Sequence, residues 1–148
     1  MIVAAIAMAA ASPANGTIAG VEARLFYNET GQLSPDVLGA DRRFVGWNTI
    51  IGEGDAGGSA DDVMILVALA ARKSDGVAAT LDTPLTIVAE AKGKTIAKRT
   101  FDNVILPYTG VTYSALYLSD VACAGTIKVT VRLGAEVRDA TLQMDCGE

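Results

Sequence analysis

Thr126-Ile-Lys-Val-Thr-Val-Arg-Leu133, followed by Gly134-Ala135, is the stretch that decides the fold. The run alternates apolar and polar residues with a period of two, which is typical of a half-buried strand. A two-residue Gly-X turn suits type II′, because the first central residue of that turn needs a positive φ. The sequence therefore predicts a hairpin with a return strand over residues 136–145, in which Leu133 faces Glu136.

Cys123 and Cys146 are the only two cysteines, and they bracket this hairpin. In the register set by the turn, Ile127 faces Leu142 and the two cysteines fall directly opposite each other. We expect a disulfide that closes the open end of the hairpin, with two buried free thiols as the alternative. Disulfides persist in oxidising compartments, and a lone pair so far apart in sequence is a poor metal signature.

Residues 1–14 have the character of a secretory signal. The run Met1–Ala11 carries no charge and is shorter than the roughly 20 residues that cross a bilayer. Ser12 and Ala14 supply the small residues of a cleavage site, so cleavage is expected before Asn15. No Lys or Arg precedes the apolar run, so a start further upstream, or a segment kept as a buried strand or helix, stays open. The mature chain, 15–148, is expected to be a single domain without a membrane span.

Composition excludes several classes of function. The chain has 148 residues and a net charge of −5, which disfavours a nucleic-acid surface and electrostatic attraction to anionic lipid. It has no histidine, so the commonest general base and every Ser-His or Cys-His pair are absent. A core of this composition must be built from Val, Ile, Leu and Ala, because aromatic residues make up only 5%.

Short alternating runs and frequent turn signals predict an all-β chain of roughly seven to nine strands. We expect an antiparallel β-sandwich of immunoglobulin-like size, with a β-barrel or jelly roll as the alternative. The unbroken apolar run after Asp62 predicts a central strand. One short helical turn is plausible at residues 34–38, with Ser34 as N-cap and Pro35 at the first helical position. Trp47, in the strand predicted over residues 44–51, is expected to lie in the core.

The loop Gly52–Asp62 is the best candidate for a ligand site. Gly52-Glu-Gly-Asp-Ala-Gly57 has the spacing of a dinucleotide motif, but a strand-like run follows where that motif needs a helix. Hard oxygen ligands on a flexible loop can bind Ca²⁺, although the spacing matches no EF-hand. The weak calcium candidates are Glu53, Asp55, Asp61 and Asp62.

Motifs for catalysis are missing or incomplete. Gly57–Asp61 lacks the last glycine of the nucleophile elbow G-x-S-x-G, and no histidine can activate its serine. A carboxylate-dependent glycosidase stays possible, because such pairs are assembled in space, but the aromatic platform is small. Asn15-Gly-Thr and Asn28-Glu-Thr match glycosylation sequons, and we interpret both as turns. The basic pairs are interpreted as solvated edge and loop charges.

The sequence predicts an exported, periplasmic or cell-surface module, of bacterial character, without catalytic activity and without a cofactor. Such a module would bind another envelope or surface protein through a sheet edge or a loop end. The alternative is a loop-based ligand binder, for Ca²⁺ or a glycan, at Gly52–Asp62. A glycosidase is the less favoured third possibility.

Overall fold

The computed structural model describes residues 13–39 and 43–147, and these residues contain strands and short 3-10 turns but no α-helix. In chain order the elements are β1 (Gly16–Phe26), β2 (Val45–Trp47), η1 (Thr49–Ile51), η2 (Gly54–Ala56), β3 (Asp62–Ala71), β4 (Ala79–Thr80), β5 (Leu85–Ala91), β6 (Lys94–Phe101), β7 (Ile105–Leu106), β8 (Thr112–Leu118), β9 (Gly125–Leu133) and β10 (Glu136–Asp145). The all-β class is therefore confirmed. Most of the proposed signal segment, residues 1–12, lies outside the described residues.

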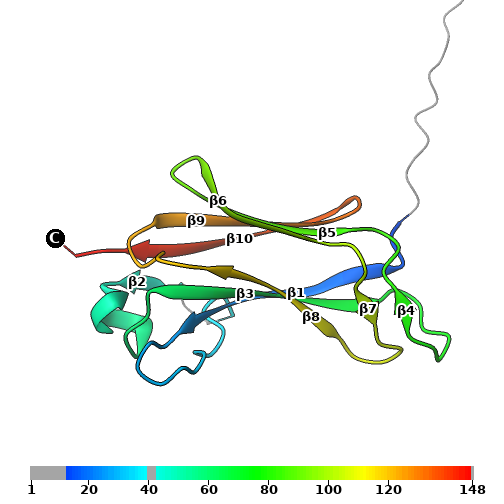
Figure 1. Ribbon diagram of the computed structural model, residues 1–148, viewed down its shortest axis with the longest axis horizontal. Coiled ribbons are helices and arrows are strands. Elements are labelled where there is room, and N and C mark those ends of the chain that lie inside the picture. The colour runs from blue at the N-terminus through cyan, green and yellow to red at the C-terminus, as the bar shows by residue number, and fades with distance from the viewer. Residues whose placement is uncertain (1–12, 40–42, 148) are drawn as a thin grey trace, which may run out of the picture.

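Two sheets form the layers of a sandwich (Figure 1). One has the strand order β1-β3-β8 and the other the order β2-β10-β9-β5-β6, while β4 and β7 pair at one end. The two larger sheets of the described chain are separate and do not close into a barrel, so the sandwich prediction is confirmed. The chain passes from one of these two sheets to the other between β1 and β2, β2 and β3, β3 and β5, β6 and β8, and β8 and β9. This order, with β5, β9 and β10 as neighbours, resembles that of immunoglobulin-type sandwiches.

Aliphatic side chains fill the space between the layers. The strand β3 lies between β1 and β8, which confirms the predicted central strand. Full burial of such a side chain stabilises the fold by about 1.5–3 kcal/mol relative to its exposed state. The largest fully buried side chains are Leu25, Ile65, Leu69, Leu85, Ile87, Leu106, Leu118, Ile127, Leu133, Leu142 and Met144.

The C-terminal hairpin has the register predicted from its turn. Leu133 pairs with Glu136, Ile127 pairs with Leu142, and Gly134 has a φ of 57°. Cys123 and Cys146 form a disulfide with a Cα–Cα distance of 5.0 Å. The two cysteines lie just before β9 and just after β10, so the bridge closes the open end of this hairpin and does not tie one sheet to the other.

A second hairpin joins β5 to β6 through Lys92-Gly93. Both turn residues have positive φ, 51° and 73°, as a type I′ turn requires. β6 is the outer strand of the five-stranded sheet and carries three Lys or Arg residues, which is typical of an exposed edge strand.

The predicted helical turn at residues 34–38 is not formed. Instead this segment lies along the free edge of β1. Ser34 N–H donates to Leu25 O at 2.9 Å, and Val37 N–H donates to Ala23 O at 2.8 Å. The Ser34 hydroxyl accepts the Leu25 N–H at 2.9 Å, so it serves the neighbouring strand and not a helix N-terminus.

The prediction that Trp47 lies in the core is wrong, because 46% of its surface is exposed. The strand predicted over residues 44–51 is only three residues long, and a 3-10 turn follows it. Within β2, Gly46 faces the interior, where an added Cβ would lie 2.7 Å from Met144 Sδ. Since side chains alternate along a strand, Val45 and Trp47 both face outward.

Candidate functional site

The acidic residues of the Gly52–Asp62 loop do not share a site, because the carboxylates of Glu53, Asp61 and Asp62 each have different hydrogen-bond partners. Glu53 accepts from the Asn48 amide at 2.7 Å, and Asp61 accepts from the Asn28 amide at 2.9 Å. Asp55, in η2, also has an interaction partner. Within residues 13–39 and 43–147, no three His, Cys, Asp or Glu side chains gather in a way that could hold a metal ion.

Asp62, the fourth calcium candidate, joins β3 to β8. Its carboxylate accepts the backbone N–H of Asp120 at 2.8 Å and the hydroxyl of Tyr117 in a short hydrogen bond. The hydrogen bond to Asp62, aided by partial desolvation, raises the pKa of Tyr117 to about 12. The carboxylate therefore stabilises the end of the three-stranded sheet.

The glycines of this loop serve the backbone. Gly52, Gly54 and Gly57 have φ values of 76°, 65° and 71°, a region that favours glycine. A Cβ on Gly52 would lie 2.9 Å from the carbonyl carbon of Gly58. The segment that follows is the strand β3, so the helix that a dinucleotide motif requires is not formed there.

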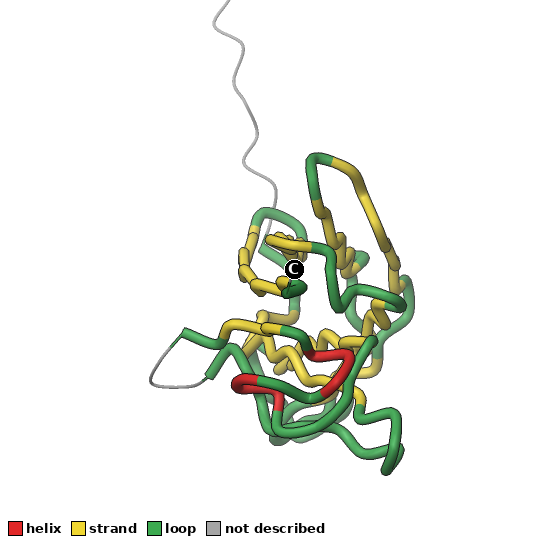
Figure 2. The backbone as a smooth tube through the Cα atoms, turned by 90° about the vertical axis from the view of Figure 1, so that its left-hand side faces the viewer, coloured by secondary structure: helices red, strands yellow, loops and turns green. Residues whose placement is uncertain are grey.

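Beside this loop, four apolar side chains stand exposed at one end of the sandwich. We call this group the end patch; it consists of Val45, Trp47, Ile50 and Ile51, with exposed fractions of 37%, 46%, 47% and 68%. Figure 2 shows the two helical turns at the end of the molecule where the C-terminus also lies. An exposed Trp among aliphatic side chains is typical of a protein interface.

Asn48 holds the end patch to the C-terminal hairpin. Its backbone N–H donates to Asp145 O at 3.0 Å, and its side-chain carbonyl accepts the Gly147 N–H in a short hydrogen bond. The Asn48 amide group also donates to Glu53. Asn48 adopts a left-handed conformation, with φ 46° and ψ 44°, in which Asn is favoured over most residues. These contacts and the adjacent disulfide preorganise the end patch.

A hollow of about 770 Å³ lies beside Trp47. It is open to solvent and combines an aromatic ring with a cation and a carboxylate. Its lining includes Trp47, Lys92, Cys123, Gly125, Asp145 and Cys146. The disulfide therefore forms part of the wall of this hollow as well as closing the hairpin.

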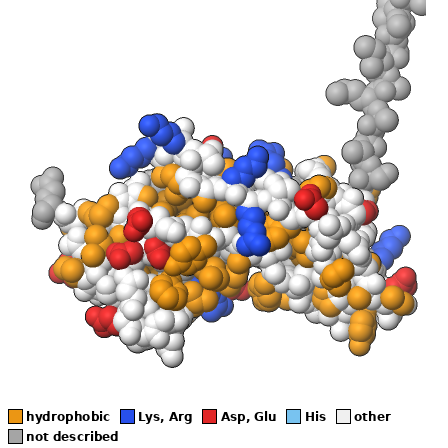
Figure 3. Space-filling model, in the orientation of Figure 1, with side chains coloured by type: hydrophobic (Ala, Val, Ile, Leu, Met, Phe, Trp, Pro, Cys, Tyr) orange, Lys and Arg blue, Asp and Glu red, His pale blue; other side chains and the backbone are white. Residues whose placement is uncertain are grey.

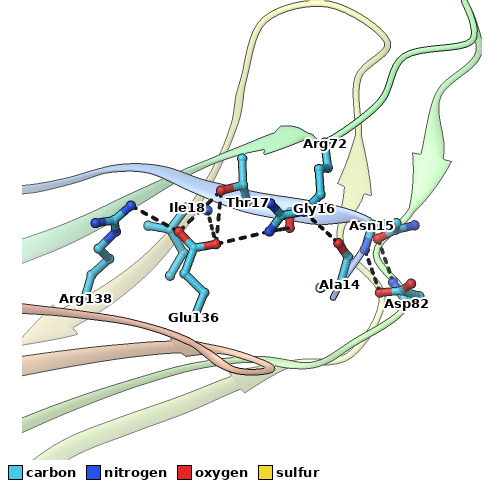
Figure 4. A network of polar contacts seen from close by, with 9 residues as sticks. All are labelled: Ala14, Asn15, Gly16, Thr17, Ile18, Arg72, Asp82, Glu136 and Arg138. Atoms are coloured by element: carbon cyan, nitrogen blue, oxygen red, sulfur yellow. Dashed lines mark hydrogen bonds and ion pairs between the residues drawn. The ribbon is translucent and has the colours of Figure 1, made fainter. Parts of the chain in front are cut away.

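At the opposite end of β10, Glu136 connects the two sheets (Figure 4). Its carboxylate accepts the Thr17 hydroxyl at 3.0 Å and the Ile18 N–H at 3.4 Å. Arg72 and Arg138 place guanidinium nitrogens 3.6 and 3.3 Å from it. Thr17, Ile18 and Arg72, which lie outside β10, thus hold the start of β10 against the start of β1.

The two sequon asparagines have engaged side chains. The Asn15 amide donates to Thr80 O at 2.8 Å, and its carbonyl accepts the Asp82 N–H at 3.1 Å. The Asn28 amide donates to Asp61. Their amide nitrogens already have partners within the fold, which agrees with the interpretation of both sites as structural turns.

The fold and these surfaces define a β-sandwich with an exposed, preorganised apolar end. No protein family model matches the chain, and no curated protein matches it in sequence. Within the described part of the chain, no helix is long and apolar enough to pass through a membrane.

The end patch was missed in the sequence because a lone Trp in an apolar run predicts burial. The signal that would have found it is Gly46. A glycine in the middle of a three-residue strand marks a close approach of the backbone to another element. With Gly46 facing inward, its two neighbours must face outward.

Proposed function

We propose that this chain is an exported, non-catalytic β-sandwich module that binds another envelope or surface protein through the end patch. The single observation that carries the proposal is the exposure of Trp47 on a rigid frame. Trp is the residue type most enriched among interface positions that dominate binding energy. Preorganisation by Asn48 and the Cys123–Cys146 bridge lowers the entropy lost on binding.

The charge around the end patch indicates the kind of partner. Glu53 is bonded to Asn48 next to the end patch, and Asp145 shares the hollow beside Trp47 with one cation, Lys92. The whole chain has a net charge of −5. Interfaces commonly have an apolar centre and a polar rim of complementary charge. We therefore propose a partner with an apolar recess bordered by Lys or Arg residues.

Export is supported by the disulfide, a crosslink that persists in oxidising compartments. Cleavage before Asn15 would remove the Ala14 carbonyl, which accepts from Arg72 Nε at 3.1 Å. It would leave the new ammonium group beside Asp82, whose Oδ1 lies 3.1 Å from Asn15 N. The mass of the chain recovered from the cell envelope tests this part of the proposal: a start at Asn15 supports it, and a retained apolar segment contradicts it.

The binding proposal is tested with envelope extract passed over immobilised protein. Trp47→Ala and Ile51→Ser should each weaken capture of the partner, with the Trp substitution reducing affinity by roughly 30-fold if Trp47 dominates the interface. The matched control is Val77→Ser, which removes an equally exposed aliphatic side chain, 66% against 68%, from another loop. Equal capture by all variants, with unchanged melting temperatures, would refute the role of the end patch.

A glycan is the second candidate ligand, because the hollow beside Trp47 places Lys92 and Asp145 next to an exposed indole. Sugar rings stack on aromatic faces while their hydroxyl groups bond to charged side chains. A titration with soluble oligosaccharides, followed by the fluorescence of this single Trp, separates the two candidates. Saturable quenching that Lys92→Ala weakens supports the glycan; no change leaves the protein partner as the function.

A further inference from the structure

The Cys123–Cys146 bridge lies outside the hydrogen-bonded ladder of the hairpin that it closes. Cys123 precedes β9, which begins at Gly125, and Cys146 follows β10, which ends at Asp145. The hairpin has other support, because β9 and β10 pair along nearly their whole length and β9 also pairs with β5. Opening the bridge therefore leaves the ladder of the five-stranded sheet in place.

The residues on either side of Cys146 hold Asn48. Asp145 O accepts the Asn48 N–H at 3.0 Å, and the Gly147 N–H donates to the side-chain carbonyl of Asn48 in a short hydrogen bond. Gly147 packs so closely that an added Cβ would lie 2.5 Å from Asn48 Nδ2. We call residues 145–147 the clasp. The middle residue of the clasp is tied to Cys123 by the disulfide.

Asn48 in turn supports the 3-10 turn η1, which carries two of the four side chains of the end patch, Ile50 and Ile51. Asn48 O accepts the Ile51 N–H at 3.1 Å and the Glu53 N–H at 3.3 Å. A single turn of this kind is not stable by itself, because nucleating a helix is unfavourable. The other half of the end patch belongs to β2, which is held by its own pairing with β10. The clasp therefore matters most for the two isoleucines.

The bridge is accessible to another protein. Cys123 is exposed, and both cysteines line the hollow of about 770 Å³ beside Trp47. Lys92 lines the same hollow, and a nearby cation favours the thiolate form of a cysteine. Figure 3 shows hydrophobic and acidic side chains at this end of the molecule, a surface that an approaching protein can reach. Exposed disulfides are the ones that exchange readily, whereas buried ones resist reduction.

We propose that the Cys123–Cys146 bridge is a site of thiol–disulfide exchange with a protein dithiol, and that its redox state controls the end patch. The inference rests on the proposed function and deepens it, since it assigns a control to the surface that binds the partner. In the oxidised form the clasp holds Asn48, and Ile51 is presented on a rigid turn. In the reduced form the clasp is released and the turn loses its support.

The exchange balances as two displacements at sulfur. A thiolate of the dithiol attacks Cys123 Sγ, the S–S bond breaks, and Cys146 leaves as a thiolate. The second thiolate of the dithiol then attacks the dithiol sulfur of the mixed disulfide and releases Cys123 as a thiolate. Two electrons pass from the dithiol to the bridge, the dithiol becomes a disulfide, and its two protons go to the sulfurs of Cys123 and Cys146.

The experiment follows amide hydrogen exchange in the full, folded chain before and after reduction with dithiothreitol, which is the probe dithiol. Alkylation and intact mass confirm that two thiols have formed. The amides of Ile51, Glu53 and Gly147 should exchange roughly tenfold faster in the reduced form, because the hydrogen bonds that hold them weaken. The Val77 amide, which bonds to Asp75 at 3.1 Å in a loop at the other end, should keep its rate.

The double variant Cys123→Ser/Cys146→Ser controls for the reductant, since its clasp should exchange fast with or without dithiothreitol. Two results would overturn the proposal. One is a bridge that dithiothreitol opens only after the chain is unfolded. The other is an unchanged exchange rate at Ile51, Glu53 and Gly147 once reduction has been verified.

Two glycine variants test whether the bridge acts through Asn48. Asn48→Gly keeps the left-handed backbone and removes the side chain that the clasp holds. Ile51 and Glu53 should then exchange fast even in the oxidised protein, and reduction should add little. Asp120→Gly is the matched control, because Asp120 also has a positive φ, 54°, and lies outside the clasp. A full redox response in Asn48→Gly contradicts the proposal.

Capture of the partner from envelope extract is the second readout. The oxidised chain should capture more partner than the alkylated, reduced chain, because binding to a loosened surface costs more entropy. Capture by neither form would refute the proposed function, while the exchange rates would still report on the clasp. Equal capture by both forms would overturn redox control, so the two failures are separately visible.

Discussion

Opening the Cys123–Cys146 bridge should lower the free energy of unfolding by about 3–4 kcal/mol. The two cysteines are 23 residues apart, and a closed loop of that size loses about 11 cal/mol/K of entropy in the unfolded chain. At 25 °C this corresponds to about 3.4 kcal/mol. For a chain of 148 residues, a loss of this size should lower the melting temperature by about 10 °C.

The assay is urea unfolding of the wild type, Cys123→Ser, Cys146→Ser and the double variant, each checked by intact mass. All three variants should lose the same free energy, because each opens the same bridge. The wild type should gain about two daltons on reduction, one for each proton taken up. A loss under about 1 kcal/mol in every variant would refute the reasoning, since the unfolded chain would then gain no freedom from the cut.

Three further predictions concern the charged side chains. The raised pKa of Tyr117 means that the folded protein keeps a proton that the unfolded chain releases above about pH 10. The free energy of unfolding should therefore fall as the pH rises from about 10 toward about 12. Absorbance at about 295 nm follows the ionisation of tyrosine and should show the Tyr117 titration moving to lower pH in Asp62→Asn. Glu136→Gln should lower stability by about 1 kcal/mol, and by less in high salt, because it removes two partly exposed ion pairs, one to Arg72 beside the other sheet and one to Arg138 on the same strand. Urea unfolding at two salt concentrations checks this prediction. Calcium at about 1 mM should leave the melting temperature unchanged, because the acidic side chains of the Gly52–Asp62 loop have separate partners; a rise that EDTA reverses would contradict this.

Features decided by neighbouring residues were predictable. The register of β9 against β10 follows from the Gly134-Ala135 turn, and the position of the disulfide follows from that register. The hairpin at Lys92-Gly93 is equally local. In each case a two-residue turn fixes the strand pairing before any distant contact forms.

Features decided by distant residues were not predictable. Ser34 has the pattern of a helix start, but hydrogen bonds to β1 outweigh one isolated helical turn, whose nucleation is unfavourable. Trp47 faces outward because β2 pairs in parallel with the end of β10, and nothing near Trp47 in sequence indicates that partner. The acidic residues of the Gly52–Asp62 loop looked like one cluster in the sequence. In the fold, Asp61 is bonded to Asn28 and Asp62 is bonded to Tyr117, and neither partner is near the loop in sequence.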